Sequence, residues 1–136
     1  MGDPVYLDTS ALVKLIVQED HSDEVGRYLD DPACQAVSSE ITEVELLRAI
    51  NRQDVQLMNR GLEVLAQTVL LPLTTSMKLR ATYLDPTTLR SLDAIHVATA
   101  LEIQTDLECL VSYDHRLLES ASAAGLRVMS PGMNAE

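Results

Sequence analysis

Residues 5–15, VYLDTSALVKL, pass from a short apolar run to a helix-like segment through one acidic residue, Asp8. The run over 5–7 has the length and side chains of a buried strand, and the segment from Ser10 to about Val17 is predicted to be a helix. No glycine lies beside Asp8, so this junction lacks the pattern of a glycine-rich phosphate-binding loop. The carboxylate at the end of the strand therefore needs another explanation.

Short apolar runs alternate with longer helix-like segments along the whole chain. Strands are predicted over 5–7, 35–39, 69–73, 108–113 and 126–130. Further helices are predicted over 22–29, 41–52, 54–67, 75–83, 88–103 and 115–124. This alternation predicts βα units, and hence an α/β fold with a central parallel sheet of four to five strands and helices on both faces.

The composition is typical of one globular domain. The chain has 136 residues, of which 46% are hydrophobic and 23% charged, which favours a single core and argues against disorder. We expect one domain over residues 1–130 and a short flexible tail over 131–136. Cys34 and Cys109 lack CxxC spacing and are predicted to be buried free thiols of a cytoplasmic protein. The N-terminus has no signal-peptide pattern, and no apolar run predicts a membrane span.

Acidic residues lie at or near the ends of predicted strands. Asp8 follows the first strand, Asp114 follows Val-Ser-Tyr, and Asp93 lies early in the helix before that strand. Because the carboxyl ends of parallel strands share one edge of the sheet, where ligands bind, we expect these side chains to gather there. Each also has a purely structural explanation. Asp8 and Asp114 would be good N-caps, and Asp93 would complement the dipole of a helix that begins at Ser91.

Asp93 is the acid that such explanations fit least well. It is the only charged residue between Arg90 and Glu102, in a helix so apolar that an unpaired carboxylate would be unfavourable. Several carboxylates at one edge repel one another and become protonated unless a cation lies among them. With oxygen ligands alone, that cation would be Mg²⁺ or Mn²⁺. Such an ion can activate a water and neutralise a phosphate, which favours phosphodiester hydrolysis.

Four segments, in this order, resemble the acidic motifs of a known family: YLDTSALVKL (6–15), TEVELLRA (42–49), RSLDAIHVATA (90–100) and SYDHRLLESASAAGL (112–126). Together they resemble PIN-domain ribonucleases, in particular the VapC toxins of VapBC toxin–antitoxin modules, over nearly the whole chain. The resemblance implies a PIN-like fold and an endoribonuclease that uses Mg²⁺ or Mn²⁺ to cleave cellular RNA, tRNA or rRNA, and so inhibits translation and growth. It also implies a homodimer and a cognate VapB-like antitoxin that assembles with it.

Carried over by position, the resemblance assigns the catalytic and metal-binding roles to four acids. These acids are Asp8, Glu45, Asp93 and Asp114. All four would hold the ion directly or through water, and Asp8 and Asp93 are the principal ligands expected. Ser10 and Ser112 are the hydroxyls expected to support them.

The second motif contains more than one acid that could serve. Glu40, Glu43 and Glu45 lie close together, and helical geometry does not choose among them. The following Leu-Leu-Arg-Ala selects Glu45 by its match to the family motif, and leaves open whether Glu43 contributes. Thr42-x-x-Glu45 also matches a capping box, in which the glutamate would only close the start of a helix.

Basic residues near these acids are candidate RNA contacts. Arg48 and Arg52 share a helical face with the second acid, where they would form either surface ion pairs or contacts to phosphates. His115 and Arg116 begin the last predicted helix and could also approach RNA. His96 lies on the most apolar helix and is expected to be a hydrogen-bonded core residue more than a metal ligand.

The charge balance limits how RNA could be bound. The chain has 21 acidic and 10 basic residues and a formal charge of −11, which disfavours a broad basic surface. Bound divalent ions, and a dimer that brings arginines of both subunits to one groove, would reduce this objection. We therefore expect weak and selective RNA binding.

Two other functions compete with the nuclease. An aspartate-nucleophile phosphatase-like α/β domain could use Asp8, but haloacid-dehalogenase-like enzymes would have a second aspartate where this chain has Ser10. A non-catalytic PIN-like interaction module would keep the fold and lose one or more acids, whereas all four are present.

Overall fold

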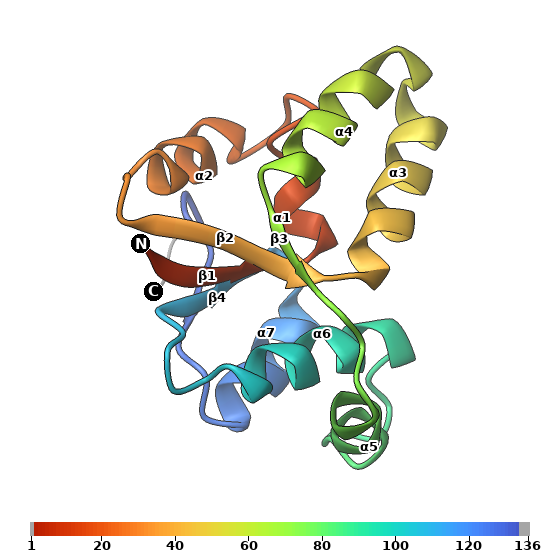
Figure 1. Ribbon diagram of the computed structural model, residues 1–136, viewed down its shortest axis with the longest axis vertical. Coiled ribbons are helices and arrows are strands. Elements are labelled where there is room, and N and C mark those ends of the chain that lie inside the picture. Colours follow the sequence, from red (N-terminus) through yellow and green to blue (C-terminus); the bar gives the residue numbers. More distant parts are fainter. Residues whose placement is uncertain (1, 134–136) are drawn as a thin grey trace.

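The structure is a computed structural model that describes residues 2–133 (Figure 1). Its centre is a five-stranded sheet in which neighbouring strands pair in parallel, in the order β3-β2-β1-β4-β5. The strands are β1 (Asp3–Leu7), β2 (Cys34–Ser39), β3 (Val69–Leu71), β4 (Cys109–Val111) and β5 (Val128–Met129). The predicted α/β fold with a parallel sheet of four to five strands is confirmed.

Helices cover both faces of this sheet (Figure 1). Helices α1 to α4 lie on one face and α6 and α7 on the other, with α5 beside α6. They are α1 (Thr9–Val13), α2 (Ser22–Leu29), α3 (Ile41–Gln53), α4 (Met58–Ala66), α5 (Thr75–Thr82), α6 (Ser91–Glu102) and α7 (His115–Ala123), with a 3₁₀ helix η1 (Val55–Leu57) before α4. Between residues 2 and 133, none of them is long and apolar enough to cross a membrane.

Alternate residues of the central strand β1 enter two separate cores. Val5 and Leu7 belong to the core beneath α1 to α4, and Tyr6 belongs to the core beneath α6 and α7. Successive side chains of a strand point to opposite faces, and each fully buried aliphatic side chain contributes about 1.5–3 kcal/mol. Because both faces hold β1, Asp8 directly after it has a fixed position.

The first helix is shorter than predicted. It ends at Val13 instead of continuing to about Val17, because the N–H groups of residues 14–16 donate to carbonyls three residues earlier. Such bonds tighten the chain into a turn of 3₁₀ type. Lys14 Nζ also donates to the Asp20 carbonyl at 2.8 Å, which connects this turn to the segment before α2.

Two other helix boundaries also differ from the sequence prediction. The segment 54–67 is interrupted because Asp54 is extended and caps the 3₁₀ helix before α4 begins. Helix α6 begins at Ser91 instead of residue 88, because Arg90 is extended. In each case a single extended residue sets the boundary. The helix-forming composition of the segment gives no indication of that residue's conformation.

The strand register brings the polar residues to one edge of the sheet. Leu7 pairs with Val111 across β1 and β4, and the Asp8 N–H donates to the Val111 carbonyl at 3.3 Å. On the other side of β1, Ser39 ends β2 opposite Leu71 of β3. All these carboxyl ends therefore lie at the edge where open parallel sheets bind ligands.

The cysteines and the predicted tail lie away from this edge. Cys34 and Cys109 are free, as predicted; Cys109 is buried and Cys34 is half-buried. The predicted tail begins at residue 131, where Tyr113 Oη donates to the Pro131 carbonyl at 2.6 Å. Residues 134–136 of that tail lie outside the described residues.

Candidate functional site

Asp8 caps α1 and is almost completely buried, with 4% of its surface exposed. Its Oδ1 accepts hydrogen bonds from Ser10 Oγ at 2.7 Å and from the Ala11 N–H at 3.1 Å. Its Oδ2 accepts from Ser112 Oγ at 2.7 Å. Neutral donors therefore hold both oxygens of Asp8, and the capping role predicted from the sequence is present.

This environment makes the Asp8 carboxylate difficult to ionise. Burial raises the pKa of Asp8 above its usual range, although the charge of His96 and the hydrogen bonds from Ser10, Ser112 and Ala11 act in the opposite direction. Desolvation penalises a charged form that has no cation bonded to it. Asp8 is therefore a carboxylate that a nearby cation would stabilise strongly.

Two serines connect Asp8 to the loop after β4. Ser10 Oγ accepts from the Tyr113 N–H at 3.0 Å, and Ser112 Oγ accepts from the Asp114 N–H at 3.1 Å. Each hydroxyl thus donates to Asp8 and accepts from the β4–α7 loop. These bonds fix Asp8 relative to Asp114 across a large distance in sequence.

Glu45 of α3 points toward the same edge and is held by two donors. Its Oε1 accepts from Thr9 Oγ1 at 2.8 Å and is bonded to His96 Nε2 at 2.8 Å. Among the described residues, no side chain or N–H is hydrogen-bonded to Oε2. One oxygen of Glu45 is therefore fixed and the other remains available for a ligand.

The predicted capping box at the start of α3 is wrong. Glu40 is the N-cap and makes no side-chain capping bond, while the Thr42 hydroxyl is buried and bonds with Ser38 Oγ at 2.7 Å. Glu43 is exposed, whereas Glu45 is partly buried and points toward α1 and α6. The packing of the strand end against Thr42 displaces the local cap.

His96 of α6 connects Glu45 to the core. It is 2% exposed, and its Nδ1 lies 2.7 Å from Tyr6 Oη. An ionised carboxylate can only accept hydrogen bonds, so the N–H at Nε2 of His96 donates to Glu45. In the neutral ring, Nδ1 then accepts a hydrogen bond from the Tyr6 hydroxyl. Burial would raise the pKa of Glu45, but the hydrogen bond and charge of His96, with smaller contributions from Thr9 and Arg90, lower it below its usual value.

Asp93 and Asp114 are joined by one arginine. Arg90 Nε donates to Asp93 Oδ2 at 2.9 Å, and its Nη2 donates to Asp114 Oδ2 at 3.0 Å. Asp114 also caps α7 as predicted, since its Oδ1 accepts from the Leu117 N–H at 3.1 Å. The partner that Asp93 requires in its apolar helix is therefore Arg90.

Three residues of this site were not predicted from the sequence. Arg90, Thr9 and Tyr6 contact the acids directly or through His96. Arg90 carries a local signal, because an arginine at the positive end of a helix is unfavourable unless an acid, here Asp93, holds it there. The other two contacts join residues far apart in sequence.

The predicted RNA contacts are all on the surface. Arg48, Arg52, His115 and Arg116 are exposed. Within the part of the chain that the structure describes, neither Arg48 nor Arg52 forms an ion pair with Glu45. The surface ion pair expected on that helical face is therefore absent, and these arginines are available to a ligand.

The donor chemistry of the site fits a hard divalent cation. Its candidate ligands are carboxylate oxygens, one carboxylate is buried with neutral donors only, and a guanidinium already lies between two others. In the conformation described for residues 2–133, no three acidic, histidine or cysteine side chains are grouped as a ready-made metal cage. Arg90 pairs with two of the four acids, Asp93 and Asp114, so a cation that binds them would require the guanidinium to move.

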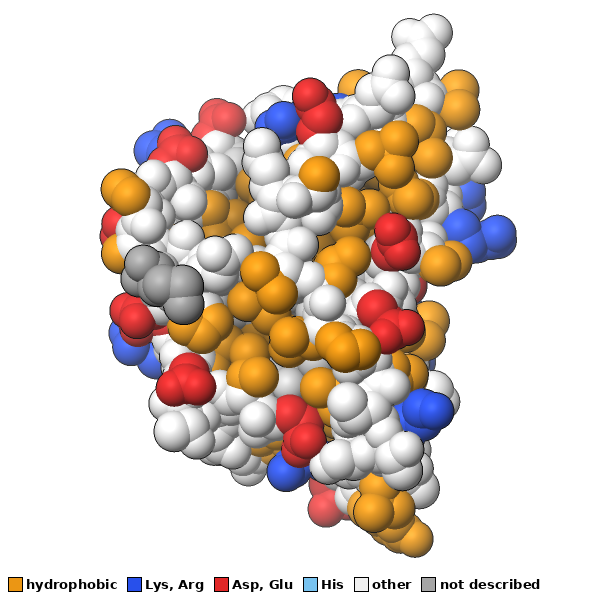
Figure 2. Space-filling view, in the orientation of Figure 1, with side chains coloured by type: hydrophobic (Ala, Val, Ile, Leu, Met, Phe, Trp, Pro, Cys, Tyr) orange, Lys and Arg blue, Asp and Glu red, His pale blue; other side chains and the backbone are white. Residues whose placement is uncertain are grey.

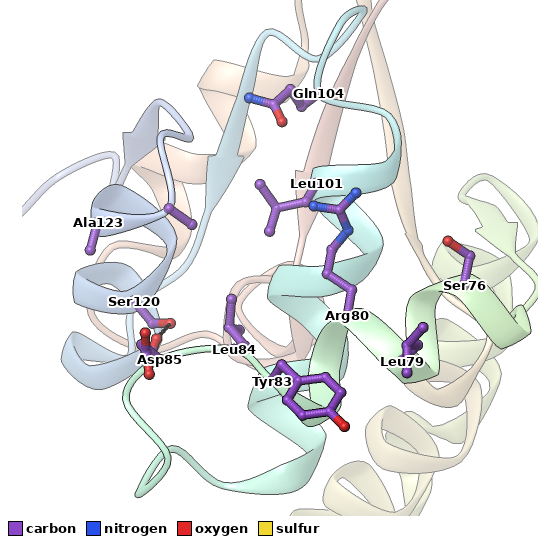
Figure 3. A pocket seen from close by; sticks show the side chains of 11 residues that line it. Ser76, Leu79, Arg80, Tyr83, Leu84, Asp85, Leu101, Gln104, Ser120 and Ala123 are labelled. Atoms are coloured by element: carbon purple, nitrogen blue, oxygen red, sulfur yellow. Dashed lines mark hydrogen bonds between the residues drawn. The ribbon is translucent and has the colours of Figure 1, made fainter.

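The acidic edge is separate from a large cavity on the side of the sheet covered by α6 and α7. That cavity, about 730 Å³ in volume, lies among α5, α6 and α7 (Figure 3). Arg80, Tyr83 and Asp85 line it together with Leu101 and Ser120, and none of the four acids is among the described residues that surround it. This cavity is therefore not part of the candidate site.

Basic side chains do not form one continuous patch on the face seen in Figure 2. Lys and Arg side chains lie at separate places around the rim, with acidic groups between them. This distribution agrees with the formal charge of −11. Any polyanion bound on this face would depend on local contacts more than on a basic surface.

Comparison with known sequences covers almost the whole domain. A family model described as PIN domain matches residues 5–122. Ribonuclease VapC47 of Mycobacterium tuberculosis (strain CDC 1551 / Oshkosh) is 40% identical over 133 residues, covering 94% of this chain and 97% of that protein. Ribonuclease VapC35 of Mycobacterium tuberculosis (strain ATCC 25618 / H37Rv) is 41% identical over 131 residues, with 94% and 97% covered. The likeness therefore includes every segment that carries the four acids.

Solved structures share the same fold at lower identity. A toxin–antitoxin complex from Klebsiella pneumoniae contains a chain that matches with a TM-score of 0.72 and 22% identity, covering 93% of this chain and 97% of that one. Mycobacterium tuberculosis VapC20, described as a sarcin–ricin loop cleaving toxin, matches with a TM-score of 0.68 and 16% identity, covering 90% and 95%. At such identities the likeness concerns the fold.

Proposed function

Because this chain belongs to the PIN-domain family, and within it to the VapC ribonucleases, we propose that it is an endoribonuclease that cleaves cellular RNA and acts as the toxin of a toxin–antitoxin pair. The observation that carries the proposal is the position of four carboxylates at one edge of the sheet, with Asp8 buried among neutral donors. Its relatives of about 40% identity are named ribonucleases. The pattern of donors explains why a divalent cation would be needed there.

The proposed cofactor is Mg²⁺, with Mn²⁺ as an alternative. The residues that would hold it, directly or through water, are Asp8, Glu45, Asp93 and Asp114. When bound, such an ion lowers the pKa of a water and neutralises negative charge on a phosphate. This requirement is supported by the oxygen-only donor set and by burial, which raises the pKa of Asp8.

The remaining contacts of the site keep its ligands in place. Ser10 and Ser112 would hold Asp8 so that its oxygens do not rotate, and Thr9 and His96 would fix one oxygen of Glu45. Pre-positioned groups avoid the free energy of reorganisation during the reaction. The fixed carboxylates would therefore define where the scissile phosphate lies.

RNA would be positioned by the exposed basic residues around the edge. We assign contacts to phosphate oxygens to Arg48, Arg52, His115 and Arg116, which are accessible to a ligand. A tRNA or an rRNA is the proposed substrate class, because a structured RNA can be selected by local contacts without a basic surface. We expect weak binding to unrelated RNA.

The proposed partners are a VapB-like antitoxin and a second copy of this chain. The fold is shared with a chain of a Klebsiella pneumoniae toxin–antitoxin complex, which supports a partner of that kind. We further propose one domain over residues 1–130, supported by the family match over 5–122. A cytoplasmic location is proposed from the two free thiols.

The proposal is tested by cleavage of total cellular RNA with and without Mg²⁺. Wild-type protein, Asp8→Asn and Asp93→Asn are compared, with folding of each variant checked by circular dichroism. We expect defined cleavage products with Mg²⁺ only, and a loss of about 100- to 1000-fold in each folded variant. Sequencing of the cut ends names the target. Wild-type levels of cleavage by a folded Asp8→Asn variant would reject the assignment, and no cleavage by the wild type would favour the non-catalytic module.

A further inference from the structure

Arg90 lies in the middle of the outer acids although it is not part of a helix. It directly precedes α6 in an extended conformation, and its side chain is 70% exposed. Two different nitrogens of its guanidinium contact two different carboxylates, Nε on Asp93 and Nη2 on Asp114. The planar guanidinium thereby bridges α6 and the start of α7.

Helix structure does not explain the position of Arg90. A cation at the N-terminal end of α6 opposes the helix dipole, and the side chain makes no capping hydrogen bond. The two carboxylates therefore account for where the guanidinium lies. They also need it, because Asp93 and Asp114 would otherwise face each other as like charges.

Arg90 lies where a divalent cation would be bound. Both carboxylates that it contacts, Asp93 and Asp114, are among the four acids proposed to hold that ion. Its side chain is 70% exposed, so the guanidinium can turn into solvent.

We propose that Arg90 is a built-in counter-ion that competes with the divalent cation for Asp93 and Asp114. This inference rests on the proposed function, in which these acids bind a divalent cation. Binding of the ion requires the guanidinium to release both carboxylates, which adds an unfavourable step to metal binding. The protein therefore keeps its outer acids neutralised when the metal concentration is low, at the expense of affinity for the metal.

The test is a Mn²⁺ titration of chelator-treated protein in the absence of RNA, followed by electron paramagnetic resonance of free Mn²⁺. Wild type is compared with Arg90→Gln, and with Arg27→Gln as a control that removes the same charge from an exposed position in the last turn of α2. We expect Arg90→Gln to bind Mn²⁺ about three- to tenfold more tightly than wild type, since two partly exposed ion pairs are removed. Arg27→Gln should bind as wild type does.

A conservative variant and a second measurement separate competition from general damage. Arg90→Lys keeps the charge but lacks the fork that reaches two carboxylates, so its affinity should lie between those of wild type and Arg90→Gln. Thermal unfolding with chelator should show Arg90→Gln less stable than Arg27→Gln, and saturating Mn²⁺ should remove that difference. An unchanged or weaker Mn²⁺ affinity in a folded Arg90→Gln variant would overturn the competition.

Failure of the inference is distinguishable from failure of the proposed function. Mn²⁺ binding that is lost in Asp8→Asn but unaffected by Arg90→Gln would reject the competition and keep the metal site. Absence of Asp8-dependent Mn²⁺ binding in both wild type and Arg90→Gln would reject both. Binding that appears only after Arg90 is replaced would support the competition in its strongest form.

Discussion

Asp8 and Glu45 form the inner half of the acidic edge, and Asp93 and Asp114 form the outer half. In the inner half the donors are three hydroxyls, a backbone N–H and a buried imidazole. In the outer half one exposed guanidinium contacts both carboxylates. Similar acids at one sheet edge are thus held by buried and partly buried hydrogen-bond donors in one half and by a solvent-exposed guanidinium in the other.

The two halves differ in how firmly the acids are held and in whether their negative charge is paired. The inner donors, such as Ser112 and His96, are anchored in the core, so the inner acids cannot move without disturbing the fold, but the negative charge of Asp8 is not paired. The outer acids are paired, but their partner can leave. The inner half therefore acts as the fixed part of the site, and the outer half as the part that can rearrange when a cation is bound.

The largest effect is expected from His96→Ala, which breaks the inner half. The substitution removes the hydrogen-bond partner of the buried Tyr6 hydroxyl and one of the two donors to Glu45 Oε1, and it creates a cavity. The free energy of unfolding should therefore fall by about 3 kcal/mol. Urea unfolding of metal-free protein measures it. His115→Ala is the matched control, since His115 is exposed, and should change stability by about 0.5 kcal/mol or less. Similar losses in both variants would show that the hydrogen bonds of His96 with Tyr6 and Glu45 do not contribute to the free energy of unfolding.

A smaller change in stability, and an increase instead of a loss, is expected from Asp8→Asn. Burial raises the pKa of Asp8, so the folded state binds the proton more tightly than the unfolded state, and ionisation above the folded pKa destabilises the fold. Each pKa unit corresponds to about 1.4 kcal/mol. The neutral amide that Asp8→Asn introduces resembles the protonated acid, and the variant should therefore unfold at a higher temperature than wild type at neutral pH. The gain should shrink as the pH falls through the folded pKa toward the ordinary aspartate value of 3.8.

Thermal unfolding of metal-free protein between neutral and acidic pH checks this prediction. Asp93→Asn is the control from the outer half, where the carboxylate already has a cationic partner. It should lose stability at neutral pH because the ion pair is lost. A pH-independent difference between wild type and Asp8→Asn would contradict an uncompensated charge in the inner half.

The sequence was sufficient for the arrangement of the edge because strand ends are local. The alternation of apolar runs with helices predicts the parallel sheet, and Asp8 and Asp114 follow strands that the sheet order places side by side. Both acids also cap helices, so the structural and functional interpretations apply to the same residue. A cap and a ligand are compatible roles for a carboxylate with two oxygens.

The donors that hold the acids could not be found in the same way. The Tyr6 to His96 contact and the Ser10 to Tyr113 contact join residues about ninety to one hundred positions apart, and no local pattern encodes them. The capping box at Glu45 failed for the same reason, because contacts with the strand end and α6 override a local preference. Residue type and position relative to the predicted strands pointed to Asp8, Asp93 and Asp114, and the family resemblance pointed to Glu45. The partners of these acids depend on tertiary packing.

The smallest effect is expected from salt acting on the outer half. Arg90 is 70% exposed, so its two ion pairs are screened and together contribute no more than about 1 kcal/mol. Raising NaCl from about 0.1 M to about 1 M shortens the screening length from about 10 Å to about 3 Å and should remove most of the stability difference between wild type and Arg90→Gln in metal-free protein. The difference between wild type and His96→Ala should stay nearly constant, because buried hydrogen bonds are shielded from ions. Equal salt dependence of both differences would mean that the two halves are not held by different means, since only the guanidinium pairs face the solvent.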